Sequence, residues 1–171
     1  MKDTLKQFVI PFSGLKLGNY AYQFILDNTF FEYFENEDIK DANVIVDLQF
    51  EKKPNMLILD FSLQGSYNVT CSRCLQNYDQ TVDGEERIIV KFGKENEDEP
   101  DIIFLPFAES KIDVRNVLYE IAILLLPMVY VHPENEIGIS QCDPEMLQKL
   151  SELSPKNKPD SQWDQLKNLL N

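Results

Sequence analysis

The sequence predicts an α+β protein in which a largely antiparallel, twisted sheet or partial barrel is covered by a helix from the C-terminal half. Apolar and polar residues alternate through residues 42–50 and again through 57–69, and a third run with the same period covers 78–92. This two-residue period is typical of strands with one buried face. Residues 114–125 instead carry apolar side chains at helical spacing, and Pro127 ends that pattern.

The elements before these runs follow the same rules. Aromatic and smaller or polar residues alternate through 20–26, which predicts a half-buried strand. An aromatic cluster among acids over 30–38 indicates a short connection with helical character. Residues 52–55 form a turn between the two longest alternating runs, so we expect a long antiparallel hairpin with one face in a core. The sheet is therefore expected to extend over residues 5–92.

The second half begins with an acidic stretch and continues into the helix. Residues 94–101 read KENEDEPD, which predicts a solvated loop, and we expect residues 95–101 to be disordered. Asp113 is expected to cap the helix, which would extend to Leu126 and cover the sheet.

Beyond residue 132 the sequence becomes polar and contains several prolines. A second helix is expected over 144–153, and an amphipathic turn or two around Trp163 close the chain. We therefore expect a single α+β domain over residues 1–132 and a polar, partly helical C-terminal tail over 133–171.

Composition predicts a cytoplasmic protein. The N-terminus lacks the basic and apolar regions of a signal peptide, and the longest apolar run, 121–131, is too short to cross a bilayer. The net charge of −13 repels phosphate backbones unless the 16 basic residues cluster, so it favours a basic partner over nucleic acid. Solubility alone would explain the same charge.

Sequence signatures of common enzymes are absent. The six glycines are scattered and form neither a phosphate loop nor a dinucleotide fingerprint. The single histidine is not accompanied by a Gly-x-Ser-x-Gly elbow. The sequence therefore predicts no catalytic residue and no bound organic cofactor, and it favours a role other than catalysis.

A C-x-x-C motif, Cys71 to Cys74, lies where one predicted strand gives way to the next. On a tight turn this spacing supplies two thiolates to a zinc ion. A thioredoxin-like redox pair instead requires a helix N-terminus to lower the thiol pKa, and the strand pattern on both sides does not provide one. His132 and Cys142 complete a set of three cysteines and one histidine.

Plain packing is the competing interpretation of these residues, since a lone cysteine is often a small buried side chain. An odd number of cysteines argues against a disulfide framework. We predict that Cys71, Cys74, His132 and Cys142 converge on one structural zinc ion. A shell of four protein ligands is closed, so the ion would serve folding and not catalysis.

The order of these motifs resembles that of the YceD family, the large ribosomal RNA accumulation proteins. The motifs are GSYNVTCSRCLQNYDQTV, the helix IDVRNVLYEIAILLLP, VYVHPEN followed by a cysteine, and SQWDQLKNLL. The resemblance runs from about residue 42 to the C-terminus and rests on Gly65, Cys71, Arg73, Cys74, Leu75, Asp113, Glu120, Leu125, Pro127, His132, Cys142, Trp163 and Leu166.

The resemblance implies a bacterial or organellar ribosome-biogenesis factor that is needed for accumulation of large-subunit ribosomal RNA, without a catalytic residue. With the charge, it predicts binding of a basic large-subunit ribosomal protein or a pre-ribosomal particle, away from membranes. The alternative is a metal- or thiol-dependent enzyme acting on RNA. A basic patch around Arg73, Lys111 and Arg115 would favour RNA contact, whereas an acid-lined concave face would favour a protein partner.

Overall fold

The computed structural model describes residues 4–93 and 102–154, which separate into two compact units. The first unit contains the chain up to Thr70 and from Asn77 to Tyr130. The second joins residues 71–76 to the chain from Val131 onward. The loop predicted to be disordered, residues 95–101, and the amphipathic turn around Trp163 lie outside the described residues.

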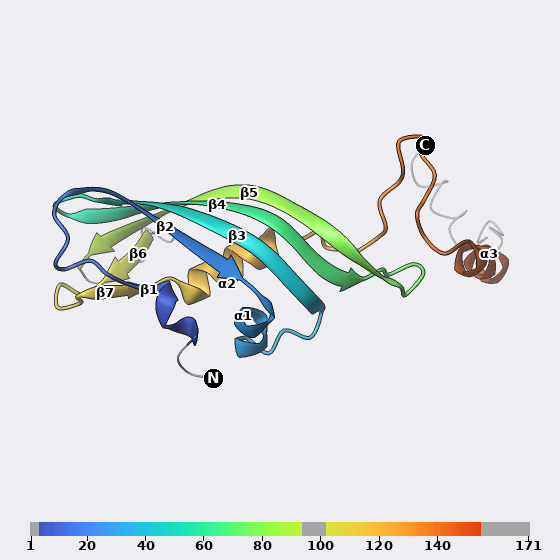
Figure 1. Ribbon diagram of the computed structural model, residues 1–171, viewed down its shortest axis with the longest axis horizontal. Coiled ribbons are helices and arrows are strands. Elements are labelled where there is room, and N and C mark those ends of the chain that lie inside the picture. Colours follow the sequence, from blue (N-terminus) through green and yellow to red (C-terminus); the bar gives the residue numbers. More distant parts are fainter. Residues whose placement is uncertain (1–3, 94–101, 155–171) are drawn as a thin grey trace, which may run out of the picture. The chain divides into compact units, whose positions relative to one another are not determined.

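The first unit is built on an open five-stranded sheet with strand order β2-β3-β4-β5-β6 (Figure 1). The antiparallel strands are β2 (Gly18–Leu26), β3 (Ile39–Lys52), β4 (Met56–Thr70) and β5 (Asn77–Phe92). The edge strand β6 (Ile102–Leu105) pairs in parallel with β5. The α+β prediction and the three long alternating strands are confirmed, and the sheet is not closed into a barrel.

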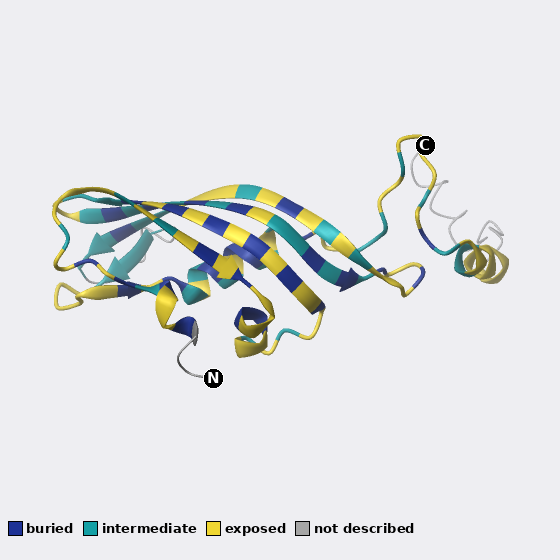
Figure 2. Ribbon diagram, in the orientation of Figure 1, coloured by how far each residue is buried: buried dark blue, intermediate teal, exposed yellow. Residues whose placement is uncertain are grey.

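Alternation along β3 creates one apolar and one polar face. Residues change between buried and exposed at each step from Ala42 to Phe50, which Figure 2 shows as bands along the strand. Phe50 lies opposite Leu59 and Leu48 opposite Phe61 on β4. Because residues directly opposite in an antiparallel pair share a face, the two strands form one continuous apolar layer.

Two helices cover this apolar layer (Figure 1). The helix α1 (Asn28–Tyr33) begins where the Asp27 carboxylate accepts a hydrogen bond from the Phe30 N–H, and it buries Phe30 and Phe31. The helix α2 (Arg115–Leu124) buries Leu118, Ile121 and Ala122. Both the helical connection after β2 and the covering helix were expected from the sequence.

A second, two-stranded sheet corrects two sequence-based expectations. The N-terminal residues do not join the main sheet: a 3-10 helix, η1 (Thr4–Phe8), leads into β1 (Val9–Pro11), which pairs antiparallel with β7 (Lys111–Asp113). Asp113 is therefore held extended opposite Val9, and the N-cap of α2 is Val114, which makes no side-chain cap bond. The Asp113 carboxylate instead accepts a hydrogen bond from the Arg115 N–H at 3.1 Å.

The helix ends differ from expectation by little. α2 ends at Leu124, two residues before the predicted Leu126. In the second unit, α3 (Pro144–Leu153) confirms the predicted helix over 144–153. The Asp143 carboxylate caps it by accepting a hydrogen bond from the Glu145 N–H at 2.9 Å. None of the helices within the described ranges has the length and apolarity that a membrane span requires.

Gly65 allows β3 and β4 to approach each other closely. A Cβ atom at this position would lie 2.1 Å from the Asn43 carbonyl oxygen and 2.7 Å from the Val44 Cα atom. Backbone atoms inside a paired strand cannot move aside as a flexible side chain can, so only glycine fits here.

We expect Gly65→Ala to lower the free energy of unfolding of the first unit by about 1–3 kcal/mol or more, because the overlap is with backbone. Gly14→Ala is the matched control, since a Cβ atom there meets no heavy atom within 4 Å. Urea unfolding followed by circular dichroism measures both variants. Equal stability of the two variants would contradict the assignment.

Tyr67 is fully buried against the Phe31 ring, and its hydroxyl has no hydrogen-bond partner among the described residues. Burial raises the pKa of this phenol above its usual value. A buried hydroxyl without a partner destabilises the folded state, so we expect Tyr67→Phe to leave the free energy of unfolding unchanged or raise it by up to about 1 kcal/mol. The same urea titration measures it, and a loss of stability would show that the hydroxyl has a partner.

Candidate metal centre

The Cys71–Cys74 pair lies on a tight turn that follows β4. The Cys71 N–H donates to the Gln76 carbonyl and the Leu75 N–H donates to the Cys71 carbonyl, each at 2.9 Å. Leu75 adopts a left-handed conformation with φ 61°, which completes the turn. The Arg73 N–H points to the Cys71 sulfur at 3.4 Å. A turn of this kind orients peptide N–H groups toward a thiolate, as metal-binding C-x-x-C turns require.

The nine residues between His132 and Cys142 form a closed loop, which explains how so wide a spacing suits one site. The Asn135 N–H donates to the Ile139 carbonyl at 2.9 Å. The Asn135 side-chain oxygen accepts from the Ile137 and Ile139 N–H groups at 3.1 and 2.8 Å. Gly138 has φ 75°, a left-handed conformation that glycine adopts at little cost. The loop therefore returns the chain to where it began.

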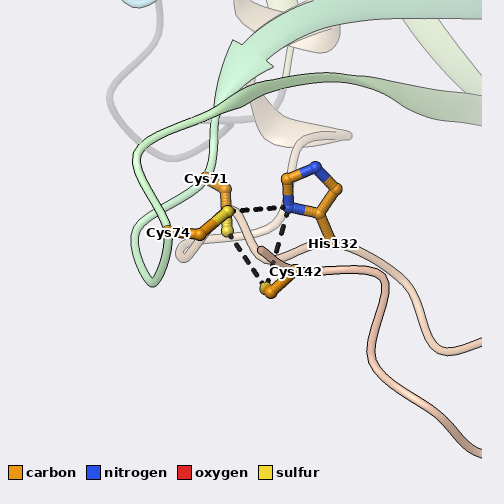
Figure 3. Close-up of side chains that lie close together, drawn as sticks. All are labelled: Cys71, Cys74, His132 and Cys142. Atoms are coloured by element: carbon orange, nitrogen blue, oxygen red, sulfur yellow. Dashed lines mark hydrogen bonds between the residues drawn. The ribbon is translucent and has the colours of Figure 1, made fainter. Parts of the chain in front are cut away.

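The four predicted ligands converge, with all ligand atoms within 4.8 Å of one another (Figure 3). The Cys71 and Cys142 sulfurs are 3.7 Å apart, and His132 Nδ1 lies 3.4 Å from the Cys74 sulfur and 3.7 Å from the Cys142 sulfur. A tetrahedral ion with Zn–S near 2.3 Å and Zn–N near 2.0–2.1 Å separates its ligand atoms by about 3.5–3.8 Å. The separations between these three pairs of atoms match a zinc shell, and the cluster could hold a metal such as zinc.

The thiols differ in how readily they ionise. Burial acts to raise the pKa of Cys71, but hydrogen bonds from the Cys74, Arg73 and His132 N–H groups and from the His132 ring outweigh it, so the pKa is lowered. The Ser140 hydroxyl acts to lower the pKa of Cys142, but burial and the neighbouring Cys71 and Cys74 thiols raise it overall. Ionisation of one thiol therefore disfavours ionisation of its neighbour, and a cation bound between the thiolates would offset this repulsion.

The buried residues of the second unit indicate what the four clustered side chains contribute to its folding. Among the described residues of that unit, the buried ones are Cys71, Cys74 and Cys142, and α3 buries none. An assembly this small without an apolar core is usually held by a metal, a disulfide or a partner. The three cysteines are free thiols. A metal would therefore take the place of a hydrophobic core here.

The redox interpretation of the C-x-x-C pair lacks its structural requirement. Residues 71–76 form a turn, so neither Cys71 nor Cys74 begins a helix. Sequence reasoning named all four residues that the structure brings together but missed Gln76, whose side-chain amide donates to the Asp143 carboxylate at 3.4 Å. The sequence signal for the start of α3 is the Asp143-Pro144 dipeptide, in which an N-cap residue precedes a first-turn proline. It predicts a helix that begins immediately after Cys142 in the sequence.

Comparison with known proteins gives one family match. The sequence model described as Large ribosomal RNA subunit accumulation protein YceD matches residues 59–170, a segment that contains all four candidate ligands. Neither the curated proteins nor the solved structures contain a significant match to this chain.

We expect protein purified without chelator to contain about one equivalent of zinc, because the four ligand atoms fit a closed tetrahedral shell. Cys74→Ser should lose most of the metal, whereas Ser72→Ala, an exposed position between the two cysteines, should retain it. Elemental analysis measures the content. Chelation should collapse the NMR signal dispersion of the second unit and leave the first unit folded.

A wild-type zinc content below about a tenth of an equivalent would contradict the metal assignment, given the tight binding typical of structural zinc. Equal zinc in the wild type and Cys74→Ser would show that the metal binds elsewhere.

Proposed function

Because the chain belongs to the YceD family of large ribosomal RNA subunit accumulation proteins, we propose that it is a non-enzymatic ribosome-biogenesis factor. Family membership connects the chain with accumulation of large-subunit ribosomal RNA. In our proposal it supports that accumulation by binding a basic ribosomal protein or a precursor particle. The observation that carries the choice of partner is the charge on the outer face of the main sheet.

The outer face of the sheet is strongly acidic. The strand alternation and register place seven carboxylates and two basic side chains on it; the acids are Asp41, Asp47, Glu51, Asp60, Asp79, Asp83 and Glu85, and the bases are Arg87 and Lys91. The Arg87 guanidinium is already paired with the Asp60 carboxylate. Such a field attracts basic partners and repels phosphate backbones.

The basic residues named for an RNA-binding patch do not provide a comparable positive surface. Arg115 is engaged by the Asp113 carboxylate, to which its Nε donates at 2.9 and 3.0 Å, and it lies over the Tyr33 ring. Lys111 and Arg115 line a hollow that also contains the acidic residues Glu109, Asp113 and Glu120, so this region has no excess of positive charge. These observations support a protein partner over direct RNA contact.

The metal centre also supports a role without catalysis. Four protein ligands would fill a tetrahedral shell and leave no position for a substrate or an activated water. In this proposal zinc is held by Cys71, Cys74, His132 and Cys142 and supplies folding energy to the second unit. An enzyme acting on RNA through this metal or these thiols is the competing function that the binding experiment below addresses.

We expect purified full-length protein to bind a basic large-subunit ribosomal protein more tightly than naked ribosomal RNA. The protein complex should weaken sharply as salt rises from about 50 to 200 mM, because exposed charges are screened. Naked RNA should bind no more tightly than roughly 10⁻⁴–10⁻⁶ M, the range of nonspecific binding. Fluorescence anisotropy at both salt concentrations measures each affinity.

Neutralising the outer face tests which charges matter. The triple variant Asp47→Asn, Asp79→Asn, Asp83→Asn should weaken binding of the ribosomal protein. A control with the same change in net charge, Glu136→Gln, Glu145→Gln, Glu152→Gln, lies in the second unit and should bind as the wild type does. Submicromolar binding of protein-free RNA at physiological salt, or RNA turnover by the metal-loaded protein, would contradict the proposal.

A further inference from the structure

A groove of about 370 Å³ lies in the first unit between α2 and strands β5 and β6. Its lining is largely aliphatic and is formed by Ile88, Ile103, Val117, Ile121, Leu124 and Leu125. Leu124 is 82% exposed and lies in the same lining as the other five apolar residues, so its exposure belongs to an apolar patch and not to an isolated side chain. The volume falls within the range of about 300–1,000 Å³ that protein ligand sites commonly have.

Every charged side chain that the described structure places in the lining of this groove is acidic. Glu85 and Glu86 come from β5 and Glu120 from α2, and all three are exposed. The groove thus combines an aliphatic floor with a carboxylate on each wall.

Glu86 is the most informative of these acids because of its register. It lies opposite Phe61 of β4, on the face of the sheet to which Val82 and Val90 contribute buried side chains. The alternation of β5 would place an apolar residue there, yet the chain carries a carboxylate. The Glu86 side chain is nevertheless exposed, and departures of this kind from the expected pattern tend to mark functional sites.

A second hollow of about 640 Å³ continues along α2 and shares Ile103, Val117 and Glu120 with the first. It contains two basic side chains, Lys111 and Arg115, of which Arg115 is paired with Asp113. The two hollows form a trough along one flank of the helix, so a bound segment of several residues can extend beyond the acidic part.

We propose that this groove is the docking site for a basic segment of a protein partner, with an aliphatic side chain on the floor and flanking lysine or arginine residues paired with Glu85, Glu86 and Glu120. The inference rests on the proposed function and adds to the acidic outer face a second contact surface, which holds one segment of the partner. Complementary charge selects the occupant: a second copy of the chain would bring the same carboxylates, and RNA or an anionic membrane would bring phosphates.

Short labelled peptides test the groove directly. One probe alternates lysine and arginine with leucine, and its companion has every leucine replaced by serine. The full-length protein should bind the leucine peptide at least about tenfold more tightly, since burial of even one leucine side chain contributes about this factor or more. Leu124→Ser should weaken only the leucine peptide. Equal affinity for the two peptides would overturn the proposal, because the aliphatic floor would then be unused.

Charge variants separate the groove from the general acidic field. Glu86→Gln with Glu120→Gln should weaken the leucine peptide by about tenfold, because paired charges in a partly desolvated site contribute more than distant ones. Asp79→Asn with Asp83→Asn changes the net charge equally on the outer face and should weaken it much less. Equal weakening by the two double variants would overturn the proposal.

Two further outcomes are decisive. If Trp163→Ala with Leu166→Ser in the full-length chain raises peptide affinity severalfold, the groove is occupied by the C-terminal residues of this chain and the proposal fails. If a basic ribosomal protein binds the wild type but is unaffected by the Glu86 and Glu120 substitutions, the proposed function stands and the groove assignment fails. If the ribosomal protein does not bind, the proposed function fails. The comparison of the leucine and serine peptides then still decides whether the groove binds a basic, aliphatic segment.

Discussion

The convergence of four side chains on one point is the interaction on which the second unit depends. Among the described residues of this unit, the three cysteines are the only buried ones. Neither the loop between His132 and Cys142 nor the helix α3 contributes a buried apolar side chain. Without a core, the ordering of this backbone has no hydrophobic compensation. Bonds from three thiolates and an imidazole to one cation would supply a compensation of sufficient size, as in other small metal-stabilised folds.

The first unit relies on the opposite principle. Residues along β3 and β4 alternate, so one face of the sheet is apolar and covered by α1 and α2, while the other carries the carboxylates. The same periodicity therefore provides the buried apolar layer that stabilises the unit and the carboxylates that make the electrostatic field of the outer face negative. The basic partner that we propose would meet an acidic surface backed by a continuous apolar layer, which preserves the spacing of the charges.

Glu86 lies where the apolar packing of the first unit meets its acidic surface. It interrupts the apolar register of β5 beside the C-terminal part of α2, where Leu125 packs so closely on Gly84 that a Cβ atom there would lie 2.3 Å from the leucine methyl carbon. The tight contact at Gly84 and the carboxylate at Glu86 are two residues apart on the same face. At Gly84 the Leu125 side chain packs closely on the strand, and at Glu86 a carboxylate lines the adjoining hollow. Close packing and the proposed recognition site therefore lie on the same short stretch of β5.

The sequence by itself determined the strand faces, the hairpin of β3 and β4, the helix α3 and the four residues of the candidate metal centre, because periodicity and residue chemistry are local properties. It did not determine the pairing of β1 with β7, which keeps Asp113 extended and moves the start of α2, nor the parallel placement of β6. The closure of the His132–Cys142 loop and the groove beside Glu86 were likewise decided by the tertiary structure. Each depends on contacts between residues distant in the chain, and those contacts leave no period in the sequence that could reveal them.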